Sequence, residues 1–189
     1  MNVNRVIQWL GLICLIAGIA RMGMTPTSLI WGTDSVQELT FGFIACILMS
    51  VGSIALYMVQ SRETGILGFI STLAIIVGNV MTTALVFTSF LPGFQEIAEG
   101  SAITGITQMI GMIGMAGGTL LYAIVTFRAK VFPRWVAVLH VVMLLSIFLP
   151  IEDNKYFAFF WGLSYVGAGL CIWIGKLTPR SVEGGKFAA

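Results

Sequence analysis

Six polar side chains interrupt the long apolar stretches of this sequence, and their chemical groups are the ones best suited to form a site. They carry amide, hydroxyl, imidazole and phenol groups, all of which donate or accept hydrogen bonds. The six residues are Asn79, Thr83, Gln108, His140, Ser164 and Tyr165. Placing such groups in apolar surroundings is costly, so each marks a site or a structural hydrogen bond. Together they could line one polar pocket between helices, and the alternative is a set of isolated interhelical hydrogen bonds.

One pair within this set, His140 with Ser164, has the residue types of a hydrolytic site. An intramembrane serine protease needs a serine nucleophile beside a histidine base, and six helices would suit the rhomboid family. The string 162–165, GLSY, lacks a glycine directly after the serine, and His140 precedes Ser164, which reverses the order in that family. We therefore predict no catalytic residue, while a membrane enzyme that uses His140 stays open as an alternative.

The residue types that hold cofactors and metals are scarce. One histidine excludes a haem with two axial histidines, and too few histidines and carboxylates lie within the apolar stretches to ligate zinc. The three cysteines Cys14, Cys46 and Cys171 lie in separate apolar stretches and form no C-x-x-C motif. The sequence predicts no cofactor and no metal site.

The composition indicates what positions these residues. The chain has 189 residues, of which 58% are hydrophobic and 10% are charged. Soluble domains carry about 25% charged residues, so we expect an all-α integral membrane protein, a single domain with a bundle of six transmembrane helices. The lipid bilayer is an expected partner and nucleic acid is not. The expected spans are about 6–24, 41–60, 65–90, 103–127, 134–150 and 156–175, followed by a cytoplasmic tail, 176–189.

Basic residues set the expected orientation. Eight of the ten fall on the side that receives both termini, namely Arg5, Arg62, Arg128, Lys130, Arg134, Lys176, Arg180 and Lys186. The positive-inside rule therefore predicts that both termini are cytoplasmic, in a bacterial cytoplasmic membrane. Arg62, Arg128, Lys130, Arg134 and Trp135 are expected to contact lipid headgroups. Residues 1–20 also resemble a signal peptide, with cleavage after Ala20 as an open alternative to a first membrane-spanning helix.

Small residues at helical spacing predict one helix contact. The fourth span carries Gly111, Gly114 and Gly118, and the third span carries Ala74 and Gly78. Small side chains let two helix backbones approach closely. We expect these two spans to pack against each other along these positions.

Two short strings carry a resemblance to a known group of proteins. They are FRAKVFPRW, residues 127–135, and the hairpin with Tyr57, Arg62, Gly65 and Gly68. Both are similar to turns of uncharacterised bacterial six-helix membrane proteins. That resemblance implies a six-helix membrane fold and brings no established activity. The size and helix count are also similar to the substrate-binding subunits of vitamin transporters of the energy-coupling type, an analogy of fold alone.

Polar groups inside the spans without a catalytic pairing favour a non-enzymatic function. We expect the bundle to bind a small or lipophilic ligand, or a membrane protein partner, between its helices. A transport protein, or the substrate-binding subunit of a transporter, is the first alternative. The membrane enzyme that uses His140 is the second.

Overall fold

The structure, a computed structural model, describes residues 3–91, 93–94, 98, 101–151 and 154–177. Within these ranges every regular element is a helix, which confirms the all-helical fold expected from the sequence. The elements are α1 (Val3–Trp31), α2 (Val36–Met58), α3 (Ser61–Ser89), α5 (Ala102–Met112), the π-helical turn η1 (Ile113–Gly117), α6 (Gly118–Ala129), α7 (Arg134–Ser146) and α8 (Phe157–Trp173). Because α5, η1 and α6 follow one another without a break, they form one rod.

Four helical stretches are long and apolar enough to cross a bilayer: Arg5–Trp31, Val36–Met58, Ser61–Ser89 and Ala102–Ala129. The other two helices are shorter. α7 has 13 residues and α8 has 17, or about 20 Å and about 25 Å of helix, against a hydrocarbon core of about 30 Å.

The end of α7 differs from expectation because Asn154 caps it. The helix ends at Ser146, short of the limit of 150 inferred from the sequence. The Asn154 side-chain amide donates hydrogen bonds to the carbonyl oxygens of Ser146 and Ile147, at 2.8 Å and 3.3 Å. Carbonyls that a longer helix would satisfy therefore find a partner in the following loop.

The first helix also ends elsewhere than expected. Residue 25 was expected to begin a polar loop, but α1 continues through Pro26 to Trp31. Pro26 has no N–H group for the Met22 carbonyl four residues earlier. The Thr27 hydroxyl lies 2.9 Å from the carbonyl oxygens of both Gly23 and Met24, in the turn that contains the proline. A short loop then leads to α2, whose N-terminus is capped by Ser35.

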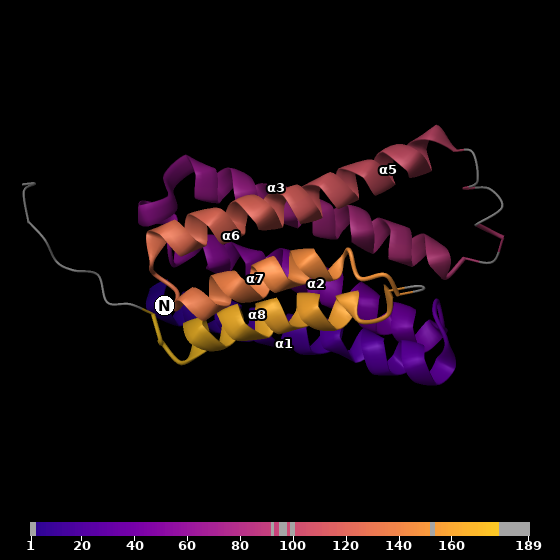
Figure 1. Cartoon of the computed structure of the whole chain (residues 1–189), viewed down its shortest axis with the longest axis horizontal. Helices are drawn as coiled ribbons and strands as arrows, with labels where there is room; N and C mark the ends of the chain where they lie inside the picture. The colour runs from indigo at the N-terminus through magenta and orange to yellow at the C-terminus, as the bar shows by residue number, and fades with distance from the viewer. Residues whose placement is uncertain (1–2, 92, 95–97, 99–100, 152–153, 178–189) are drawn as a thin grey trace, which may run out of the picture.

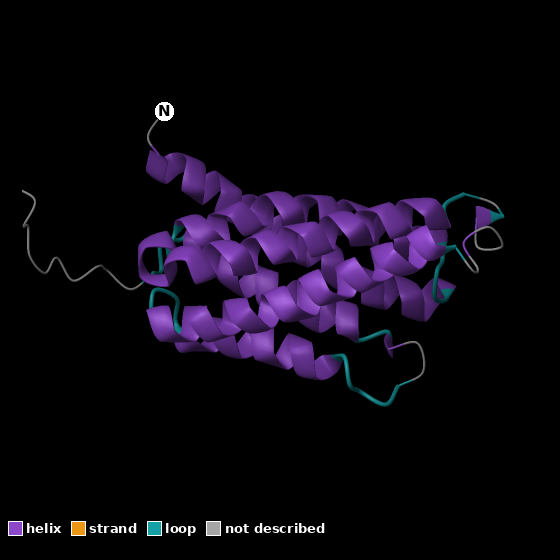
Figure 2. Cartoon of the chain, turned by 90° about the horizontal axis from the view of Figure 1, so that it is seen from above, coloured by secondary structure: helices purple, strands orange, loops and turns teal. Residues whose placement is uncertain are grey.

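The helices pack as a closed ring in chain order. α1 packs against α2, α2 against α3, α3 against the α5–η1–α6 rod, α6 against α7, and α7 against α8, which returns to α1. The helix axes run along the long direction of the molecule, and the loops gather at its two ends (Figure 2). One end holds the N-terminus, the turn between α2 and α3, the turn between α6 and α7, and the end of α8 (Figure 1). We call this the basic end.

Glycines bring helix backbones into direct contact, most closely in the pair α1 and α8 and in the pair α3 and the α5–η1–α6 rod. In the antiparallel pair α1 and α8, a Cβ atom added at Gly18 would lie 2.5 Å from the Gly162 carbonyl oxygen. One at Gly169 would lie 2.8 Å from the Gly11 carbonyl oxygen. Real Cβ atoms do not approach so closely, so a side chain at either position would push the two helices apart.

The second backbone contact joins α3 to the α5–η1–α6 rod. A Cβ atom at Gly78 would lie 2.6 Å from the Met115 amide nitrogen, and one at Gly114 would lie 2.7 Å from the Ala74 carbonyl oxygen. Gly118 faces Ala74 in the same way, and Gly111 faces Met81. The five small residues expected to pack together therefore all lie in this contact.

Candidate functional site

Buried polar side chains inside the ring form three clusters. The His140 cluster contains Gln60, Tyr122, Thr126 and His140. The Tyr165 cluster contains Ser53, Asn79 and Tyr165, and the Arg21 cluster contains Arg21, Glu38, Cys46 and Trp161. All eleven side chains are at most 9% exposed.

The His140 cluster joins side chains from three helical regions. Gln60, in the turn before α3, donates from Nε2 to the Thr126 hydroxyl on α6 at 2.9 Å. The Tyr122 ring, one turn earlier on α6, lies 5.0 Å from the His140 ring of α7, centroid to centroid. His140 Nδ1 is 2.8 Å from the Val136 carbonyl oxygen. A carbonyl only accepts, so Nδ1 carries the proton in this contact and Nε2 of the neutral ring is an acceptor.

Among the described residues, three buried polar atoms of this cluster make no hydrogen bond of ordinary geometry: Gln60 Oε1, the Tyr122 hydroxyl oxygen and His140 Nε2. The Tyr122 hydroxyl nevertheless lies close enough to Thr126 and Gln60 to interact weakly with both. Gln60 Oε1 and His140 Nε2 are acceptors, and the Tyr122 hydroxyl can donate or accept. A buried polar atom left unpaired costs about 1–3 kcal/mol. The arrangement therefore suits a small molecule that donates hydrogen bonds.

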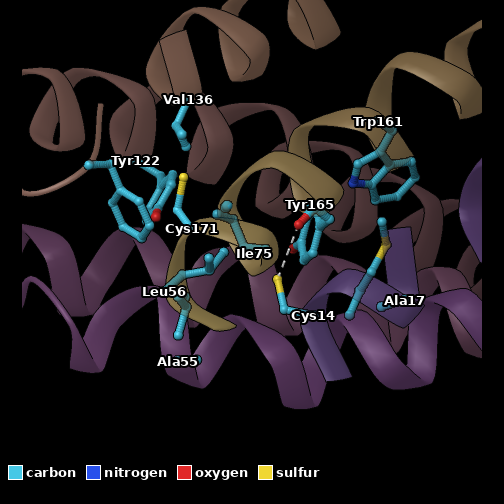
Figure 3. Close-up of a cluster of buried hydrophobic side chains, with 14 of the residues drawn as sticks. Cys14, Ala17, Ala55, Leu56, Ile75, Tyr122, Val136, Trp161, Tyr165 and Cys171 are labelled. Atoms are coloured by element: carbon cyan, nitrogen blue, oxygen red, sulfur yellow. Dashed lines mark hydrogen bonds between the residues drawn. The ribbon is translucent and has the colours of Figure 1, made fainter. Parts of the chain in front are cut away.

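The Tyr165 cluster contains a buried hydrogen bond between α8 and α2. The Tyr165 and Ser53 hydroxyl oxygens are 2.8 Å apart. Ser53 donates to the Met49 carbonyl of its own helix at 2.7 Å, so Tyr165 is the donor to Ser53. Asn79 of α3 faces the same Tyr165 hydroxyl. On the other side, the Cys14 thiol approaches the Tyr165 carbonyl oxygen at 3.6 Å, as the dashed line in Figure 3 shows.

The Arg21 cluster holds a buried positive charge. Arg21 is 6% exposed, and its Cζ atom lies 3.9 Å from the centre of the Trp161 ring of α8. Its Nη1 atom donates to Cys46 Sγ of α2 at 3.6 Å, and its buried Nε atom has no partner. Glu38, near the start of α2, interacts with Arg21 electrostatically.

The structure separates the six residues from which a single pocket was expected. Asn79 and Tyr165 share one cluster, and His140 belongs to the next. Two of the others satisfy their own helices: Ser164 donates to the Trp161 carbonyl at 2.8 Å, and Thr83 donates to the Asn79 carbonyl at 2.8 Å. Gln108 is exposed on α5, outside the ring interior, contrary to the expectation that it would line the pocket.

Sequence reasoning missed five of the interior side chains: Arg21, Ser53, Gln60, Tyr122 and Thr126. In the sequence, Gln60 and Tyr122 were interpreted as residues at the end of a span. Arg21 was interpreted as lying near a helix end, because the first span was expected to stop at residue 24. With α1 continuing to Trp31, Arg21 lies about 15 Å from the end of the helix. A charge inside an uninterrupted apolar helix is a signal that could have found it.

The residues assigned to lipid headgroups all lie at the basic end. Arg62, Arg128, Lys130, Arg134 and Trp135 are exposed. Three of these cations, Arg128, Lys130 and Arg134, lie in or beside the turn between α6 and α7 and are exposed. Lys130 adopts the left-handed conformation, with φ of 57°, and ends α6. Phe132 is 2% exposed and anchors the turn in the core, and Pro133 precedes the first residue of α7.

Among the residues described, no group of three or more histidine, cysteine or acidic side chains could hold a metal ion. Comparison of the chain with family models, with curated proteins and with solved structures gives no match. The functional argument therefore starts from the three clusters.

Proposed function

We propose that this chain is an integral membrane protein that crosses the bilayer six times, with both termini on the cytoplasmic side of a bacterial cytoplasmic membrane. Successive loops alternate between the two ends of the helical ring, as a multi-pass protein requires (Figure 1). Exposed basic side chains gather at the end that holds the N-terminus: Arg5, Arg62, Arg128, Lys130, Arg134 and Lys176. The positive-inside rule places that end in the cytoplasm.

Cysteine labelling tests this topology. The native residues Cys14, Cys46 and Cys171 are all buried, so background labelling by a membrane-impermeant maleimide should be low. In intact cells we expect the reagent to label Gln37→Cys, at the start of α2, and to label Arg128→Cys only after the membrane is permeabilised. The reverse pattern would place the basic end outside, and labelling of both variants in intact cells would contradict the six-span topology.

The function that the interior supports best is non-enzymatic binding of a small ligand that donates hydrogen bonds. The observation that carries this proposal is a pair of buried acceptors next to Tyr122. His140 Nε2 belongs to the ring that faces Tyr122, Gln60 Oε1 belongs to a side chain near the Tyr122 hydroxyl, and neither atom has a hydrogen bond of ordinary geometry among the described residues. An occupant that donates to these atoms offsets the cost of burying them. The contacts of His140 and Ser164 also favour binding over catalysis, since Ser164 donates to the Trp161 carbonyl and the His140 ring faces Tyr122.

Tyr122→Phe tests this proposal through the amount of bound ligand. If a ligand bonds to the hydroxyl, losing it removes a favourable contact, and we expect a lower melting temperature in mild detergent. The hydroxyl also lies near Thr126 and Gln60, so the bound mass, and not the melting temperature alone, decides between an occupied and a dry cluster. Native mass spectrometry should detect a discrete small molecule on the wild-type protein and less of it on Tyr122→Phe.

The matched control is Tyr156→Phe, which removes a hydroxyl from an exposed tyrosine. We expect neither its melting temperature nor its bound mass to differ from wild type. A wild-type protein that carries no bound molecule, or a Tyr122→Phe protein that carries as much of it as the wild type, would contradict the ligand site.

Transport is the second candidate. Its support is that buried polar side chains occur at three places in the interior, in the Gln60–Thr126, Ser53–Tyr165 and Arg21–Cys46 contacts, rather than at one site. A transporter would move the ligand identified by mass spectrometry into sealed proteoliposomes, whereas a binding protein would retain it without net uptake.

A further inference from the structure

The environment of Arg21 leaves its charge poorly compensated. A guanidinium has five N–H donors in one plane. The acceptor that the structure assigns to it is the Cys46 sulfur at 3.6 Å, and a thiol is a weak acceptor. The Trp161 ring covers one face of the guanidinium, 3.9 Å away. It therefore does not accept from the N–H groups, which lie in the guanidinium plane. The Nε donor is buried and unpartnered.

Glu38 does not supply the missing hydrogen bonds. Its carboxylate accepts from the Asp34 amide at 2.7 Å, and its side chain faces Ser28. It therefore helps to order the loop between α1 and α2. Among the residues described, no carboxylate forms a salt bridge with Arg21, and Glu38 acts on it only through its electric field. A buried cation without a partner in contact is strongly unfavourable in a membrane protein.

We propose that Arg21 anchors a second binding site, one for an oxyanion. The ligand's carboxylate or phosphate group accepts from Nε and the neighbouring N–H edge while the guanidinium stays stacked on Trp161. Arginine is suited to this geometry, because its planar fork matches two oxygens of one anion. The site is distinct from the His140 cluster, where the buried acceptors require a ligand that donates hydrogen bonds.

Two sources can supply this anion: the headgroup of an amphiphile that enters from the bilayer, or a free inorganic anion. The experiment compares three probes on the full-length protein in nanodiscs: decanoate, inorganic phosphate and 1-decanol, an uncharged alcohol with the same alkyl chain length as decanoate. The readout is the melting temperature as a function of probe concentration. We expect a rise that saturates with an anionic probe and is absent with decanol. Decanoate acting alone identifies an amphiphile, and phosphate acting alone identifies a free anion.

Variants assign the effect to Arg21. Arg21→Gln should weaken binding of the active anion at least about tenfold, because a charge-assisted pair is lost. The matched control is Arg5→Gln, which removes an exposed arginine at the other end of the molecule and should bind as wild type does. Glu38→Gln keeps Arg21 and removes the nearest competing negative charge, so it should bind the anion more tightly.

Several results would overturn the proposal. A rise in melting temperature with decanol equal to that with decanoate would mean that the alkyl chain and not the anionic group binds. A wild-type protein that neither anion stabilises, or an Arg21→Gln protein that binds the anion with unchanged affinity, would also contradict the site. If Arg21→Gln does not fold, Glu38→Gln decides, since weaker or unchanged anion binding by that variant contradicts the site.

Discussion

Gly162→Ala is expected to destabilise the protein by about 2–3 kcal/mol, because its new methyl group has no room. A Cβ atom at this position would contact the Gly18 carbonyl oxygen and lie 2.7 Å from the Met22 amide nitrogen. Both are backbone atoms of α1, so relief requires that α1 and α8 move apart. For a chain of this size the loss corresponds to a fall of about 5–10 °C in melting temperature, which circular dichroism in detergent measures.

The control is Gly105→Ala, whose added Cβ atom would meet no atom within 4 Å. Gly105 lies inside α5, where alanine is the better helix former by up to about 1 kcal/mol. We therefore expect the opposite sign, a small gain in stability. Equal effects of the two substitutions would mean that the contact between α1 and α8 does not hold the ring together.

Trp161→Ala is expected to cost about 3–5 kcal/mol, the usual loss when a buried aromatic side chain is truncated. Trp161 is 2% exposed and covers the Arg21 guanidinium at 3.9 Å. Removing the ring leaves a cavity and also takes away the face that stabilises a buried charge. Folded yield and melting temperature should both fall, whereas Trp31→Ala, at a tryptophan that is 55% exposed, should change stability little.

A double-mutant cycle with Arg21→Met separates the two losses. The cavity is the same in both backgrounds, but the charge is present in only one. Trp161→Ala should therefore cost about 1–2 kcal/mol less in the Arg21→Met protein than in the wild type. Equal costs in the two backgrounds would show that Trp161 contributes only packing.

The class of the fold could be predicted from the sequence, but the helix ends could not. Apolar stretches separated by short polar segments require helices when the surroundings are lipid, since each helix satisfies its own backbone. Where a helix ends depends on individual side chains. α1 continues past Pro26 and Asn154 stops α7 at Ser146, and neither outcome is visible in composition.

The interior clusters were foreseeable only in part for a related reason. Asn79, His140 and Tyr165 stand out because each is polar within an apolar run. Whether such a side chain finds a partner depends on which helices are neighbours and how each is rotated. Tyr122 meets His140 because α6 packs against α7.

Glycine contacts show the same limit. The four-residue spacings of Ala74 and Gly78 and of Gly114 and Gly118 are a familiar pattern and pointed to the contact between α3 and the α5–η1–α6 rod. Gly11 and Gly18 are seven residues apart, as are Gly162 and Gly169. Their complementarity is recognisable only when α1 and α8 are known to lie side by side in opposite directions.

The short helices α7 and α8 give the molecule two flanks of unequal height. They are neighbours in the ring, at about 20 Å and 25 Å, while the α5–η1–α6 rod rises about 42 Å. In the membrane orientation proposed above, a flat bilayer would not match both flanks at once, so the lipid beside α7 would thin or the protein would tilt toward that side. The molecule would then have the shape of a wedge, and membranes whose thickness or curvature changes locally would accommodate it at the lowest elastic cost.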